Sequence, residues 1–244
     1  MNKNLLLAIG ITILFLGIAV QPSIATVQPE QDIIDIEPKD YLFQTIIDIA
    51  NNPEIKNLLK QNNHDLFTSD YDYKKIYSEL LVRNPRLLFS MLFTKPSKTY
   101  NYLEKCYNDG IEITKIIGEH EVARILESID ISDIELFDEI NNIITKNDVL
   151  SNRISLLKDL NYDLKSNKLW DNYPIICSIL FAIMIYEIIS GYLLAFFLEI
   201  IGVKPIISMF FTIIGIIKYF IGNAIVILIF KLPCIDPPNE VNRI

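Results

Sequence analysis

Two long apolar runs near the C-terminus place the strongest constraint on how this chain can fold. Residues 175–198 and 206–230 are predominantly apolar, and the short connector 199–205 separates them. Each run has about 24 residues, or about 36 Å as a helix, enough to cross a hydrocarbon core of about 30 Å. Backbone groups in lipid must be hydrogen-bonded within their own segment, and a short connector joins antiparallel neighbours. The pattern therefore predicts a transmembrane helical hairpin over residues 174–232.

The first 25 residues are typical of a secretory signal peptide. Lys3 precedes an apolar run over residues 5–20, and a helix breaker with small residues leads up to Ala25. This order predicts cleavage after Ala25. An uncleaved signal anchor is the alternative, because the apolar run is near the length limit for either. Both versions place residues 26–172 outside the cytoplasm.

Residues 36–160 are predicted to form an all-α extracytoplasmic domain, after a flexible acidic arm over 26–35. Helix signals recur there with short spacing, and no stretch shows the alternation of a strand. We interpret the domain as an irregular bundle of about eight helices. A solenoid-like arrangement is the alternative, because Asn-Pro pairs at 52–53 and 84–85 lie 32 residues apart.

Caps and breakers predict individual helix boundaries. Pro38 begins a helix that ends at Asn51, and each Asn-Pro pair supplies an N-cap followed by proline at the first helical position. Asp109-Gly110 predicts a helix end, and Gly118 predicts a second break. The remaining expected starts are Ser69 or Asp70, a capping box opening at Ser132, and Asn147 or Asp148.

The segments that flank the hairpin are interpreted from their composition. Residues 161–173 form a polar juxtamembrane linker, in which Trp170 and Tyr173 are predicted to lie at headgroup depth as interfacial anchors. Residues 233–244 form a C-terminal tail. The leader and the hairpin together predict a multi-pass protein of a cell membrane, with its main domain outside the cytoplasm.

Each apolar run carries one ionisable residue near its middle, Glu187 in the first and Lys218 in the second. In a hairpin that turns at Gly202 these two residues have the same depth, so the sequence predicts an intramembrane ion pair. Small residues on the same faces are expected to let the helices pack closely. These packing residues are Gly191, Ala195, Ser208, Gly215 and Gly222. The pair either fixes the register of the hairpin or serves as a proton or ion relay, and we favour the first role.

The spacing of the three cysteines, Cys106, Cys177 and Cys234, matches no metal or redox motif. Cys177 and Cys234 fall near the same end of the hairpin, so a disulfide between them is conceivable. We expect two free thiols instead, because pairing requires a Cβ geometry that the sequence cannot show.

The formal net charge of −8 and the pI of about 4.9 argue against nucleic acid as a partner. No catalytic, cofactor or metal motif is present, so the sequence favours a non-enzymatic protein without a cofactor. We interpret it as a membrane-anchored extracytoplasmic interaction or scaffold module, whose partners are the lipid bilayer and a membrane or cell-surface protein. The alternative is a membrane-embedded subunit of a transporter or channel that uses Glu187 and Lys218 at the midplane.

Overall fold

The computed structural model of the 244-residue chain describes its central part and most of its apolar segments. The described residues are 37–62, 67–69, 71–93, 99–131, 133–163, 173–200, 219–232 and 234. The expected signal peptide, the acidic arm, Trp170 and Lys218 therefore lie outside the described residues.

The described residues fold almost entirely as helices, as the sequence predicts. The helices are α2 (Pro38–Asn51), α3 (Pro53–Asn62), α4 (Lys74–Arg83), α5 (Pro85–Phe93), α6 (Thr99–Ile117), α7 (Glu119–Glu127), α8 (Ile134–Lys146), α9 (Asp148–Asp163), α10 (Ile175–Ile200) and an unlabelled helix, Tyr219–Lys231. The boundaries of α2 are those that Pro38 and Asn51 predict.

One short antiparallel pair of strands interrupts the helices. Strand β1 (Phe67–Ser69) pairs with β2 (Ile129–Ile131), so that Phe67 faces Ile131. Strands of three residues are too short to show an alternating pattern, which explains why the sequence did not indicate them. The helix expected to begin at Ser69 or Asp70 begins instead at Lys74, because Ser69 belongs to β1.

Asparagine caps begin three of the helices. The Oδ1 atoms of Asn52, Asn84 and Asn147 accept hydrogen bonds from backbone N–H groups three residues ahead, each at 3.1 Å. These bonds satisfy donors that the first turn of a helix leaves without partners. In α8 the cap is Asp133, whose Oδ1 accepts from the backbone N–H of Leu136 at 2.9 Å, and not the predicted Ser132.

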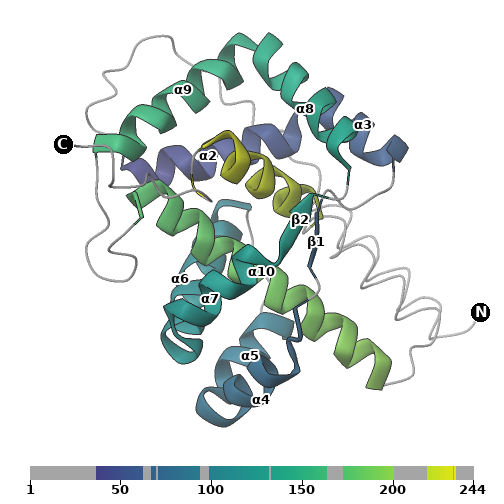
Figure 1. Ribbon diagram of the computed structural model, residues 1–244, viewed down its shortest axis with the longest axis vertical. Helices are drawn as coiled ribbons and strands as arrows, with labels where there is room; N and C mark the ends of the chain where they lie inside the picture. Colours follow the sequence, from purple (N-terminus) through teal and green to yellow (C-terminus); the bar gives the residue numbers. More distant parts are fainter. Residues whose placement is uncertain are drawn as a thin grey trace, which may run out of the picture.

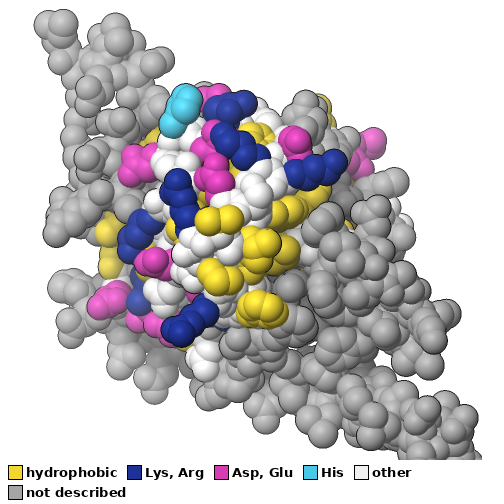
Figure 2. Space-filling view, turned by 90° about the horizontal axis from the view of Figure 1, so that it is seen from below, with side chains coloured by type: hydrophobic (Ala, Val, Ile, Leu, Met, Phe, Trp, Pro, Cys, Tyr) yellow, Lys and Arg dark blue, Asp and Glu magenta, His cyan; other side chains and the backbone are white. Residues whose placement is uncertain are grey.

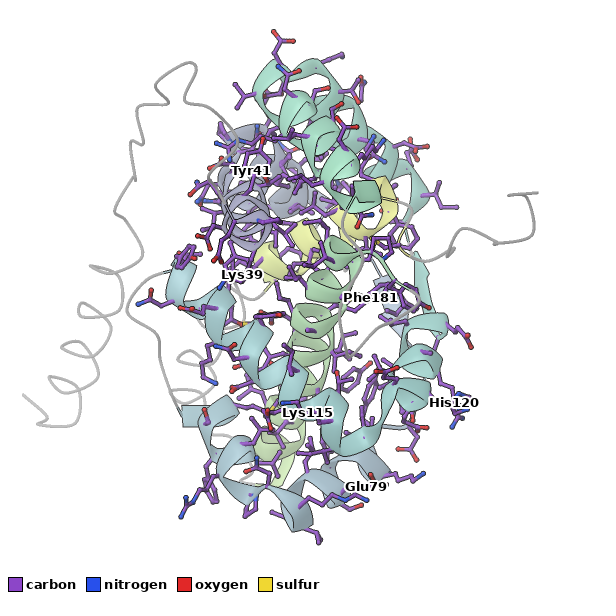
Figure 3. The ribbon with its side chains drawn as sticks, turned by 90° about the vertical axis from the view of Figure 1, so that its left-hand side faces the viewer. Lys39, Tyr41, Glu79, Lys115, His120 and Phe181 are labelled. Atoms are coloured by element: carbon purple, nitrogen blue, oxygen red, sulfur yellow. A yellow bond between two sulfur atoms is a disulfide. The ribbon has the colours of Figure 1, made fainter. Side chains whose placement is uncertain are left out.

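Helix α10 runs through the centre of the molecule and contacts two groups of helices (Figure 1). Helices α2 and α9 contact α10 towards its N-terminal part, and α3 and α8 lie at the same end of the molecule. Helices α4 and α5 lie near its C-terminal part, and α6 packs along its side (Figures 1 and 3). The helix Tyr219–Lys231 packs among the first group. There Phe230 meets Phe137 of α8 edge to face at 5.7 Å between ring centroids.

A disulfide between Cys177 and Cys234 joins the beginning of α10 to a position three residues beyond the helix Tyr219–Lys231. The expectation of two free thiols is therefore wrong. Packing of the two helices brings the Cα atoms to 5.3 Å although the residues are 57 apart in sequence. That separation suits a disulfide, and it depends on tertiary contacts that the sequence does not reveal.

Among the described helices, α10 is the one long and apolar enough to cross a membrane, over Ile175–Ala195. Its most apolar window has a mean hydropathy of 2.0, but 78% of that window is buried inside the protein. A long core helix meets the same criterion of length and composition as a membrane span. Residues 201–218 lie outside the described residues, so the two-helix transmembrane hairpin stays a prediction.

Candidate functional site

The closest contact of α10 is with α6, and it depends on Gly110. A Cβ atom at Gly110 would lie 1.9 Å from the carbonyl oxygen of Ala182 in α10. A glycine is therefore required where the two backbones approach. The sequence interpretation of Gly110 as a helix end is wrong, because α6 continues through it to Ile117. The predicted break at Gly118 is confirmed, since its φ of 88° suits glycine.

A row of residues four apart forms the α6 side of this contact. The row consists of Tyr102, Cys106, Gly110 and Thr114. Residues at this spacing lie on one face of a helix. Cys106, Gly110 and Thr114 are buried, and the Thr114 hydroxyl donates to the carbonyl oxygen of Gly110 at 2.9 Å. This row therefore combines a close backbone approach at Gly110 with a hydrogen-bonded hydroxyl at Thr114.

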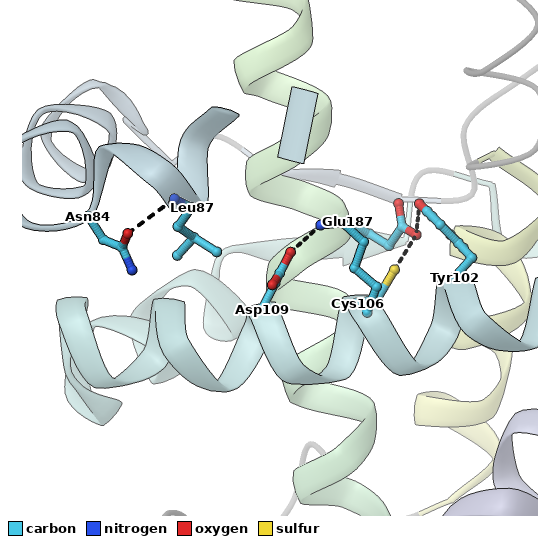
Figure 4. Close-up of polar contacts among 7 residues, drawn as sticks. Asn84, Leu87, Tyr102, Cys106, Asp109 and Glu187 are labelled. Carbon is cyan, nitrogen blue, oxygen red and sulfur yellow. Dashed lines mark hydrogen bonds and ion pairs between the residues drawn. The ribbon is translucent and has the colours of Figure 1, made fainter. Parts of the chain in front are cut away.

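The polar end of the row contacts Glu187 of α10 (Figure 4). The Tyr102 hydroxyl donates to Glu187 Oε1 at 2.5 Å, and Cys106 Sγ lies 3.6 Å from the same oxygen. An ionised carboxylate in an apolar helix is costly unless hydrogen bonds satisfy it. Residues of α6 therefore stabilise Glu187 inside the protein.

Burial, followed by the nearby Glu187 charge, raises the pKa of Tyr102 well above its ordinary value. The phenol consequently stays protonated at physiological pH and keeps donating its hydrogen bond. A hydrogen bond to a charged acceptor in a buried place is stronger than one between neutral groups.

An ion pair also lies on α6, beside this row of residues. Lys105 and Asp109 form an ion pair at the i,i+4 spacing, and both side chains are largely covered. The Lys105 ammonium also lies over the ring of Tyr186 in α10, 5.1 Å from its centroid. An ammonium group over an aromatic face is attracted to it. This pair adds a further electrostatic contact between the two helices.

The arrangement favours structural stabilisation over nucleophilic chemistry. Cys106 is fully buried and its Sγ contacts the Glu187 carboxylate, whereas reactive cysteines are partially exposed. Within the described residues, no group of three His, Cys, Asp or Glu side chains is placed to hold a metal ion. The cluster is best described as a polar lock between α6 and α10.

The predicted partner of Glu187, Lys218, lies outside the described residues, so their ion pair stays a prediction. The packing residues Ser208 and Gly215 also lie outside them. Gly191 and Ala195 are exposed, and a Cβ at Gly191 or at Gly222 would meet no described atom within 4 Å. Close packing at these positions therefore also stays a prediction.

Tyr173, a predicted interfacial anchor, is half-buried and packs edge to face on Phe181 at 5.0 Å between ring centroids. Its partner in that prediction, Trp170, lies outside the described residues. The position of Tyr173 relative to a membrane stays a prediction.

Sequence reasoning missed Tyr102 and Cys106 as the residues that contact Glu187. The signal available was the spacing of four from Tyr102 to Thr114, which places aromatic, small and hydroxyl side chains on one face of α6. That pattern indicates a close helix contact, but it does not identify the partner helix.

One shallow depression of about 230 Å³ lies between α8, α9 and Lys231. Burial, followed by the nearby Lys158 charge, lowers the pKa of Lys231 there. The nearby Asp138 charge acts in the opposite direction.

Comparison with known proteins adds no relative: no family model, no curated protein and no solved structure matches this chain.

Proposed function

We propose that the protein is a non-enzymatic helical interaction module that works outside the cytoplasm and is held at a cell membrane by its C-terminal apolar segment. The observation that carries the location is the Cys177–Cys234 disulfide. Disulfides form and persist mainly in oxidising compartments, and they are rare in the cytosol. The leader-like first 25 residues support the same location.

The burial of α10 changes where lipid contact is proposed. Side chains from Ile176 to Ile189 are covered by other parts of the protein, apart from the partly exposed Glu187. They cannot face lipid while the domain is folded. The apolar sequence continues over residues 194–218, which include Phe210 and Phe211. We therefore assign the membrane contact to residues 194–218 and not to the whole first run.

An interaction role is preferred to a transport role because the polar cluster on α6 and α10, which contains Glu187, stabilises the fold. Glu187 is the residue that a transport role would use, and its carboxylate accepts a hydrogen bond from Tyr102. This contact gives Glu187 a structural task, so the transporter alternative has no observation in its favour. The absence of catalytic motifs in the sequence supports a binding module.

The test uses the full chain in a cell that exports it, with membranes washed at alkaline pH and treated with protease from outside. We expect the chain to stay in the membrane fraction and the domain to be digested. On a non-reducing gel the chain should migrate faster than after reduction, because the disulfide keeps the denatured chain compact.

A matched pair of variants tests the assignment of the lipid contact. Phe210→Lys combined with Phe211→Lys should release the chain from washed membranes, because charges are costly in hydrocarbon. Ile134→Lys, an exposed position on α8, should leave it bound. Release of the unaltered chain, or protection of its domain inside the cell, would contradict the proposal. Co-purification after crosslinking then identifies the partner protein.

A further inference from the structure

Helices α4 and α5 expose large apolar side chains at one end of the molecule. Leu81, Val82 and Phe89 are 58%, 83% and 62% exposed, and they make up three of the six large hydrophobic residues exposed in the described part of the chain. Figure 2, which views the molecule from the α4–α5 end, shows a group of hydrophobic side chains on this face, with both Lys and Arg and Asp and Glu side chains elsewhere on it. We call Leu81, Val82 and Phe89 the apolar face.

These exposed residues are additional to the side chains that hold α4 and α5 in place. Ile76 and Leu80 of α4, and Leu87, Leu88 and Met91 of α5, are buried in the core. Each helix therefore has an inner apolar side that supports the fold. The apolar face is a candidate interaction site because it is exposed, and exposed apolar patches commonly mark such sites.

The same two helices are basic, although the whole chain has a formal net charge of −8. Residues 74–93 contain the four basic residues Lys74, Lys75, Arg83 and Arg86 against the single acidic residue Glu79, which gives a net charge of +3. All four basic side chains are exposed. Arg83 already donates to the carbonyl oxygen of Ile116 at 2.7 Å, so the exposed charges proposed to meet a partner are Lys74, Lys75 and Arg86.

The apolar face lies at the C-terminal end of α10. Tyr77 of α4 donates to the carbonyl oxygen of Ile189, and the ring of Tyr73 stacks on that of Tyr192 at 4.2 Å between centroids. Figures 1 and 3 place α4 and α5 at this end of the molecule. The chain that follows α10 is the apolar segment to which membrane contact is assigned.

We propose that α4 and α5 form a docking face for a bilayer surface that carries anionic lipid headgroups. The apolar face enters the boundary between headgroups and acyl chains, while Lys74, Lys75 and Arg86 bind headgroup phosphates. The inference rests on the proposed function, because it requires a membrane at this end of the molecule. Docking fixes the orientation of the domain and turns α8 and α9 away from the lipid.

The experiment places a polarity-sensitive fluorophore on the full chain through Val82→Cys. Cys106 is buried and Cys177 is bonded to Cys234, so the new thiol is the accessible one among the described residues. Ile134→Cys, 69% exposed on α8, is the matched control. The probes are vesicles of phosphatidylcholine alone and of equal parts phosphatidylcholine and phosphatidylglycerol, with flotation recorded on the same samples.

We expect the label at position 82 to shift to the blue and to be quenched by brominated lipid in the anionic vesicles. The label at position 134 should stay in water. Each exposed basic residue near an anionic surface contributes about fivefold to binding, so Lys74→Gln, Lys75→Gln and Arg86→Gln together should lower the ratio of docked to undocked domain about a hundredfold. Lys146→Gln, on α8, should change this ratio less than twofold, which is about the resolution of such a measurement.

Flotation separates failure of this inference from failure of the proposed function. If the chain floats with both vesicles while the label at 82 stays in water, docking is overturned and anchoring stands. If the chain floats with neither and the label does not shift, both proposals fail. Equal shifts in neutral and anionic vesicles would refute headgroup binding, and a shift without vesicles would show that a protein surface covers the face.

Discussion

Helices α4 and α5 and helices α8 and α9 form two helical pairs that are built alike but have opposite surfaces. In each pair the second helix begins at an asparagine cap, Asn84 or Asn147. Residues 74–93 have a net charge of +3, whereas residues 134–163 have three basic and six acidic residues and a net charge of −3. The pairs lie towards opposite ends of the molecule (Figures 1 and 3).

The acidic pair is tied to its surroundings by specific contacts. Arg153 of α9 forms an ion pair with Asp48 of α2 at 3.0 Å and lies over the ring of Tyr41. Asn161 of α9 donates to the disulfide sulfur of Cys177 at 3.3 Å. The basic pair is also tied to the rest of the fold, through Tyr77, Tyr73 and Arg83, but it carries the three exposed residues of the apolar face. The same capping interaction begins the second helix of both pairs, whereas the net charges of the two pairs are opposite.

Removing the disulfide should have the largest effect, because it breaks the covalent link at the acidic end. We expect Cys177→Ser combined with Cys234→Ser to lower the free energy of unfolding by about 4 kcal/mol, the loop-closure value for residues 57 apart. Guanidinium unfolding measures this loss. Hydrogen exchange should increase in α9 and in Tyr219–Lys231 before it increases in α4 and α5.

Reduction of the unaltered protein provides the control, and it should reproduce the same loss and the same exchange pattern. A uniform increase in hydrogen exchange across both helical pairs would contradict this prediction, because it would show that the disulfide stabilises both ends of the molecule equally.

Replacing Gly110 should weaken the contact through which α6 and α10 connect the two ends. A Cβ atom would clash with the backbone of Ala182, and relieving the clash requires a shift of a whole helix. Gly110→Ala should therefore lower the free energy of unfolding by about 3 kcal/mol. Chemical denaturation of both variants measures the effect. Gly191→Ala is the matched control and should stabilise by about 0.5 kcal/mol, because it gains helix propensity in open space. Equal effects at the two glycines would contradict the close approach.

Tyr102→Phe tests the polar lock at the same contact without a change of shape. The substitution removes the hydroxyl that donates to Glu187, and we expect a loss of about 2 kcal/mol in the free energy of unfolding. The control is Tyr107→Phe on the same helix, whose ring packs on Phe43 and should retain that packing. That control should change stability by less than about 0.5 kcal/mol. A loss no larger than in the control would show that Glu187 is satisfied without Tyr102.

The smallest expected change in stability concerns Tyr100 of α6, which contacts α2 near the acidic pair α8 and α9. Its hydroxyl donates to Asp40 at 2.5 Å, and this hydrogen bond is the first cause that raises the pKa of Tyr100 to about 12. The unfolded value is about 10. Because the folded pKa is higher, the stabilisation is complete below pH 10 and is lost as the pH rises from about 10 to about 12.

Melting temperatures of the unaltered protein and of Tyr100→Phe, recorded across that range, measure this dependence. The difference between them should shrink as the pH rises. A constant difference up to pH 12 would show that Tyr100 does not titrate differently in the folded and unfolded chain.

Local signals predicted much of the helical structure. Pro38 and Asn51 correctly bounded α2, Asn52 and Asn84 were correctly identified as caps, and Gly118 as a break. Each of these signals acts within a few residues, so the backbone chemistry is already present in the sequence. The strands β1 and β2 were not predictable, because three-residue segments are defined by their pairing partner.

The sequence by itself determined the helical class, most helix starts and the opposite charges of the two helical pairs, because these depend on neighbouring residues and on composition. The tertiary structure decided that Cys177 bonds to Cys234, that Gly110 lies inside a helix, and that Glu187 contacts Tyr102, 85 residues away. The physical reason is that burial and pairing depend on which helices pack together. An apolar helix has the same sequence pattern whether protein or lipid surrounds it.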